Sequence, residues 1–194
     1  MNIRQSIAKS LAIAVATMTL AACGGGGDEG STTSTGSSAS PTAPDFSNLQ
    51  SCIANRWEMG AEQIKKGMET VGGSSASGVT FSVTGSTISN FASSGAYTGS
   101  PNFTVNFSSG STSGTMKTVG TANGTWSLSG DMLTITRTSS SVVVTQTIAG
   151  STTSYTDPVG SPSTVKVISC TPATLTYDQT LSSGAVVRIV LVSA

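Results

Sequence analysis

Cysteines and carboxylates are the residues of this 194-residue chain that could do chemistry, because the sequence contains no histidine. Without histidine there can be no Ser-His-Asp or Cys-His nucleophile and no histidine-bound metal. The nine Asp and Glu residues form no paired-carboxylate motif and no calcium loop. We therefore expect no catalytic residue, no metal, no cofactor and a protein that is not an enzyme.

The N-terminal region is typical of a secretion signal. Two basic residues precede the apolar run Leu11–Leu20, which is too short to span a bilayer of about 30 Å as a helix. Residues 20–23 then read Leu-Ala-Ala-Cys, which resembles the lipobox of bacterial lipoproteins. The resemblance implies that residues 1–22 are a signal peptide that is removed, and that Cys23 carries the lipid. The alternative is ordinary signal-peptide cleavage that leaves Cys23 unmodified.

Lipidation of Cys23 would make the membrane the first partner of this protein. Each buried CH₂ group contributes about 0.8 kcal/mol, so several acyl chains on one cysteine make release slow. Gly24 stands where an aspartate commonly retains such lipoproteins in the inner membrane, which favours the outer membrane of a Gram-negative envelope. Residues 23–45 combine the lipidated cysteine with a Gly/Ser/Thr/Pro tether that cannot bury a core.

The two other cysteines, Cys52 and Cys170, are candidates for a disulfide, which would fit an oxidising compartment. Two cysteines in an exported chain most simply form one disulfide. This bond would tie the start of the folded domain to a strand near its end. The alternative is a pair of free thiols.

Residues 46–194 read as a β domain. Val79–Val83 and Phe103–Phe107 alternate apolar and polar residues, which predicts strands with one buried face. The segments on either side of Ser129–Asp131 predict a hairpin. Further strands are expected at 142–148, 165–168, 175–177 and 185–192. Short strands separated by glycine turns favour an all-β fold, either an antiparallel barrel or a β-sandwich.

The segment Phe46–Met68 differs from the rest of the domain. Its apolar residues recur at near-helical spacing, and Glu62 and Lys66 form an i,i+4 pair. We expect a short N-terminal helical segment here, with Arg56–Met59 starting the first strand.

Residues 124–135 (GTWSLSGDMLTI) resemble a hairpin of the bacterial lipocalin-like lipoproteins. Further matches to that pattern are an early tryptophan (Trp57), a strand with a turn after it (79–83 and Gly85), a penultimate pair (165–175) and a last strand (186–192). The resemblance covers roughly residues 52–194. It implies a small antiparallel up-and-down β-barrel of the calycin type, with the β-sandwich as the alternative.

The resemblance also suggests which side chains face the barrel interior. An arginine near the end of such domains packs over the early tryptophan, so Arg188 would pack over Trp57; the alternative is an outward-facing arginine. The residues that would line a ligand cavity, or simply fill the barrel, are Trp57, Phe81, Phe103, Phe107, Trp126 and Arg188.

Three functions follow from these patterns. The first is a non-enzymatic lipoprotein whose barrel binds a small apolar ligand. The second is an inhibitor of an envelope enzyme, such as a lysozyme or a protease, with Ser108–Gly114 or Ser151–Pro162 as the inserting loop. The third is a structural surface domain. Nucleic acid is not an expected partner, because the chain has a net charge of zero with only nine basic residues.

Overall fold

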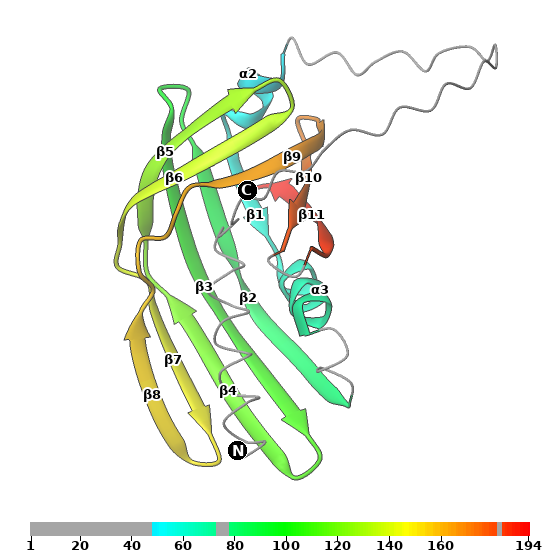
Figure 1. Cartoon of the computed structure of the whole chain (residues 1–194), viewed down its shortest axis with the longest axis vertical. Coiled ribbons are helices and arrows are strands. Elements are labelled where there is room, and N and C mark those ends of the chain that lie inside the picture. Colours follow the sequence, from blue (N-terminus) through cyan, green and yellow to red (C-terminus); the bar gives the residue numbers. More distant parts are fainter. Residues whose placement is uncertain (1–47, 73–77, 182–183) are drawn as a thin grey trace, which may run out of the picture.

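The computed structural model describes residues 48–72, 78–181 and 184–194 (Figure 1). The expected signal peptide, Cys23 and tether lie outside the described residues. The described chain begins with helix α2 (Leu49–Ile53), strand β1 (Arg56–Met59) and helix α3 (Ala61–Gly72), so the predicted helical segment and first strand are confirmed. Among these residues, no helix combines the length and apolar character needed to cross a membrane.

All other elements are strands, and every pairing between strands is antiparallel. The strands are β2 (Val79–Phe91), β3 (Ala96–Ser109), β4 (Thr112–Val119), β5 (Ala122–Ser129), β6 (Met132–Ser140), β7 (Val143–Ile148), β8 (Ser151–Thr156), β9 (Ser163–Cys170), β10 (Thr174–Thr180) and β11 (Val186–Ser193). The hairpin predicted around Gly130 joins β5 to β6, as expected.

Eight strands close into a barrel. Their order is β2-β1-β11-β10-β9-β6-β5-β3, and the pairing of β2 with β3 completes the ring. A barrel without free edges satisfies the backbone hydrogen bonds of its wall. The fold is therefore an all-β antiparallel barrel, and the alternative of two separate packed sheets is wrong.

The sheet also extends beyond the barrel (Figure 1). β3 pairs with β5 through Ala96–Gly99 but with β4 through Asn102–Ser109, and Pro101, which has no backbone N–H, lies between these segments. β4 then pairs with β7, and β7 with β8. We call residues 79–86 of β2, residues 102–109 of β3, and β4, β7 and β8 the sheet extension.

Gly85 marks the point where β2 passes from the extension toward the barrel. The turn expected here is wrong, because β2 continues to Phe91. Gly85 has a φ of +87°, and a Cβ atom at this position would lie 2.9 Å from the Cα of Phe103. Glycine at this position thus allows the positive φ and the close approach of the β3 backbone while the pairing of β2 with β3 stays unbroken.

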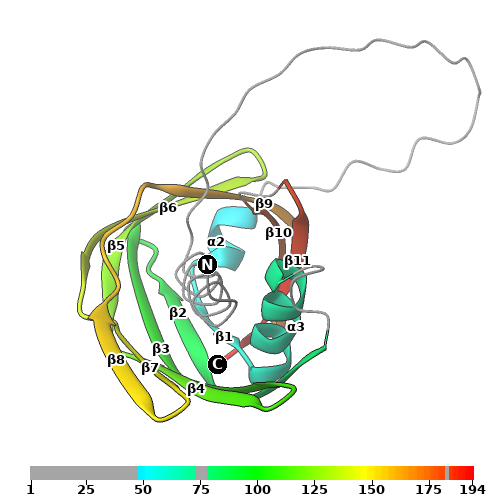
Figure 2. The same cartoon turned by 60° about the horizontal axis from the view of Figure 1, so that its bottom comes forward.

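Two hydrophobic cores result from this arrangement. The barrel core surrounds Trp57 and Trp126, whose indole N–H groups donate to the carbonyls of Ile53 (3.0 Å) and Ala92 (2.8 Å). α2 lies inside the ring of strands (Figure 2) and contributes Leu49 and Ile53 to this core. The second core belongs to the sheet extension and to α3.

A disulfide fixes α2 to the barrel wall. Cys52 in α2 is bonded to Cys170 at the end of β9, with 6.1 Å between their Cα atoms and a sequence separation of 118 residues. The predicted pairing of these two cysteines is confirmed. The bond joins the first described helix to a strand near the end of the chain, so it holds the helix in the barrel mouth.

Candidate functional site

The residues expected to line one cavity are divided between the two cores. Trp57 and Trp126 lie in the barrel core. Phe81, Phe103 and Phe107 lie instead in the core of the sheet extension. The sequence pattern identified all five as buried, but it assigned the three phenylalanines to the wrong core, because β2 and β3 run far beyond the barrel.

Arg188 lies on the outer surface of the barrel, which corrects the predicted packing over Trp57. Its side chain is 57% exposed, and it bonds the Asp178 carboxylate through Nε (2.8 Å) and Nη2 (2.9 Å). Strand alternation turns Val187 and Ile189 inward and Arg188 outward. The hydrogen bond from Arg188 holds the pKa of the Asp178 carboxyl below its usual value.

Buried side chains of the described residues form the barrel core, and a small cavity lies among them. A cavity of about 40 Å³ lies beside Met59, Tyr97, Arg137 and Tyr177. One water molecule occupies about 30 Å³, whereas pockets for small molecules measure roughly 300–1,000 Å³. Burial raises the pKa of Tyr97 and of Tyr177. This cavity could hold about one water molecule, and the barrel core around it is formed by packed side chains.

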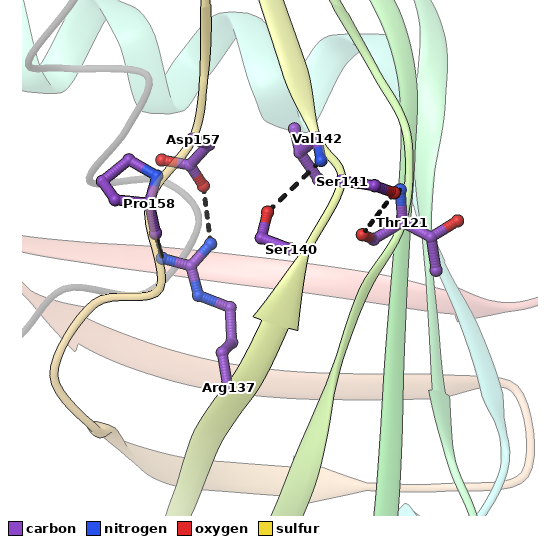
Figure 3. A network of polar contacts seen from close by, with 7 residues as sticks. All are labelled: Thr121, Arg137, Ser140, Ser141, Val142, Asp157 and Pro158. Carbon is purple, nitrogen blue, oxygen red and sulfur yellow. Dashed lines mark hydrogen bonds and ion pairs between the residues drawn. The ribbon is translucent and has the colours of Figure 1, made fainter.

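A buried ion pair joins the barrel to the sheet extension (Figure 3). Arg137 of β6 donates from Nη1 to Oδ2 of Asp157 (2.6 Å) and from Nη2 to the carbonyl of Pro158 (3.2 Å). Asp157 directly follows β8, and its backbone N–H donates to the carbonyl of Val142 (2.8 Å). Both side chains of the ion pair are almost completely buried. This contact fixes the chain where it leaves the extension and returns to the barrel.

The inner face of the sheet extension carries an apolar surface with two polar groups in it. Strand register places Val105 beside Met116, Met116 beside Gln146, and Thr118 beside Val144. These side chains are all buried. α3 packs along β2 and β11, across the molecule from β7 and β8 (Figure 2).

Thr118 and Gln146 are the unusual members of this face. Thr118 is 1% exposed and Gln146 is 7% exposed, yet Oγ1 of Thr118 and Nε2 of Gln146 have no hydrogen-bond partner in the described structure. Buried polar groups are nearly always paired, so two unpaired groups on adjacent strands need an explanation. Sequence reasoning missed both residues, although Gln146 lies within the predicted strand 142–148.

The two segments expected as inserting loops consist of a hairpin and of a strand followed by the irregular residues 157–162. Ser108–Gly114 forms a tight hairpin between β3 and β4. Ser151–Thr156 is strand β8, and Asp157 after it is held by Arg137.

The fold and the site together define a packed eight-stranded barrel with an apolar sheet extension. Within the described ranges, no three Cys, Asp or Glu residues come together as metal ligands. No protein-family model matches the chain, and no curated protein matches it significantly.

Proposed function

We propose that this chain is a bacterial lipoprotein, anchored to the outer membrane through Cys23, that binds an acyl chain bearing a carbonyl or carboxylate group. The inner face of the sheet extension is the binding surface, and the barrel supports it. The protein acts by binding rather than by catalysis. The anchor rests on the resemblance of residues 20–23 to a lipobox.

The observation that supports acyl binding is the pair of buried, unpaired groups on Thr118 and Gln146. Leaving a buried donor unpaired costs about 1–3 kcal/mol. A threonine hydroxyl and a glutamine amide can both donate to the same acceptor oxygen. Around them, Met116, Val105 and Val144 belong to a buried apolar cluster that also contains Ile64 and Met68 of α3. A hydrocarbon chain would pack within this cluster, where methionine side chains can adapt to its shape.

Mass spectrometry of the purified protein tests the anchor. We expect a chain that begins at Cys23 and carries acyl groups, and a Cys23→Ser variant that is unacylated and released from membranes. An unmodified Cys23 in the wild-type protein would contradict the anchor without affecting the binding proposal.

Calorimetric titration with palmitic acid tests the binding. The Cys23→Ser background avoids detergent. We expect Gln146→Met and Thr118→Val to weaken binding by about tenfold, since each removes one hydrogen bond to the ligand. Both variants should fold at least as stably without ligand, because each removes an unpaired buried group.

The matched control is Thr147→Val, which alters the outer face of the same strand. The Thr147 hydroxyl bonds Thr152 (2.9 Å), away from the proposed site. The Thr147→Val variant should bind palmitic acid as the wild-type protein does. Equal binding by the wild-type protein and by Gln146→Met would contradict the proposed site.

A further inference from the structure

β8 forms the free edge of the sheet. It is the last strand in the sheet order, and among the described strands only β7 pairs with it. Five of its six residues are exposed. Proteins usually protect such an edge with a charge, a proline or a bulge. Ser151–Thr156 contains no charged residue and no proline, and its pairing with β7 has no register shift.

The hairpin geometry shows which backbone groups point outward from β8. The two-residue turn at Ala149 and Gly150, both with positive φ, makes the Ile148–Ser151 pair hydrogen-bonded. Hydrogen-bonded and non-hydrogen-bonded pairs then alternate. The side chains that contact each other across the non-bonded pairs agree with this alternation: Thr147–Thr152 at 2.9 Å and Thr145–Ser154 at 3.0 Å.

The backbone N–H and C=O groups of Thr152, Ser154 and Thr156 therefore face the free edge. Three residues with outward groups are enough for a short antiparallel ladder with another strand. The side chains of these residues lie on the outer face, where hydroxyl groups already bond each other across β7 and β8.

We propose that β8 pairs antiparallel with β8 of a second copy of this chain and so joins two sheets into one. A twofold axis through Ser154 would place Ser154 opposite Ser154 and Thr152 opposite Thr156 of the second copy. A symmetric pair brings every charge of a strand close to its own copy, and an uncharged strand avoids this repulsion. Hydroxyl pairs like those between β7 and β8 would then also form between the two β8 strands.

Site-specific crosslinking of the full chain in the cell envelope tests this pairing. In the proposed register the Cα atoms of the two Ser154 residues lie about 5.5 Å apart. Those of the two Thr152 residues lie about 15 Å apart, because they are offset by four residues along the strands and lie on different strands. A short bifunctional thiol reagent should therefore crosslink Ser154→Cys into a dimer, whereas Thr152→Cys and the wild type should stay monomeric.

Ser154→Pro provides a second test. Proline removes a backbone N–H that faces the free edge, so the β7–β8 hairpin keeps its own hydrogen bonds. We expect the sedimentation of Ser154→Pro to show association at least about tenfold weaker than wild type, because each copy loses a ladder bond. Thr153→Val, which keeps the outward backbone groups, should associate as the wild type does.

Three other outcomes of the crosslinking experiment would each overturn the proposal. Failure of Ser154→Cys to crosslink in a protein that retains its Cys52–Cys170 bond would exclude the paired edge. Equal crosslinking at positions 152 and 154 would indicate random collision. A crosslinked band that does not have twice the mass of the chain would assign the edge to a different protein.

Discussion

At the scale of single residues, the two arginine–aspartate pairs differ in burial. Burial determines how much stability is lost when one partner of an ion pair is removed. Arg137 and Asp157 are buried, and Arg137 also bonds a carbonyl. Arg188 binds both carboxylate oxygens of Asp178, but this pair lies on the barrel surface. Removing one partner of a buried pair leaves an uncompensated charge, whereas an exposed pair contributes little.

Arg137→Met should therefore lower the free energy of unfolding by about 3–5 kcal/mol. Arg188→Met should lower it by less than about 1 kcal/mol. Chemical denaturation of both variants beside the wild type measures the difference. Equal effects would mean that the Arg137 contact does not hold the extension onto the barrel.

The burial of two tyrosines should make the stability of the folded protein depend on pH in the alkaline range. Burial raises the pKa of Tyr97 and of Tyr177 above the ordinary value of 10.0. A raised folded-state pKa contributes stability that is complete below about pH 10 and is lost as the pH rises further. Each such phenol should cost about 1.4 kcal/mol per pH unit in that range.

Denaturation at pH 9, 10 and 11 measures this loss, with Tyr177→Phe as the comparison. We expect the variant to lose less stability than the wild type between pH 10 and 11. An identical pH profile would show that Tyr177 ionises freely in the folded protein.

At the scale of elements, the turn between β7 and β8 holds a strained residue. Ala149 is the non-glycine residue with positive φ (49°) in the described chain, and it precedes Gly150 (83°). Both positions of this turn type require positive φ, which asparagine tolerates better than alanine. Ala149→Asn should raise the free energy of unfolding by about 0.5–1 kcal/mol. A thermal melt of the variant with lowered stability would contradict this turn geometry.

The sequence predicted the strands more fully than it predicted their partners. Alternation located strands at 79–83 and 103–107 because each has one buried face. It could not show that β3 has two successive partners, since pairing is set by segments distant in sequence. Gly85 suggested a turn because a positive φ suits a turn as well as a bent strand.

The candidate site was less predictable than the fold. Phe81, Phe103 and Phe107 were recognised as candidates for the interior. Thr118 and Gln146 were not recognised, because a threonine in a threonine-rich strand gives no sign of its hydrogen bonding. Only the three-dimensional neighbours of these side chains show that both lack a partner.

At the scale of the whole molecule, the barrel and the sheet extension have different roles in our proposal. The disulfide and the filled core give the barrel a fixed shape. The extension holds the unpaired buried groups on its inner face and the free β8 edge at its rim. In our proposal the anchored barrel therefore presents both surfaces above the membrane.

Native mass spectrometry of the protein purified from its own membrane tests the central claim most directly. We expect a non-covalent adduct with the mass of a carbonyl-bearing acyl molecule in the wild type and in Thr147→Val. This adduct should be lost in the Thr118→Val/Gln146→Met double variant. A folded wild-type protein without an adduct, or an adduct that the double variant retains, would contradict acyl binding at the inner face of the sheet extension.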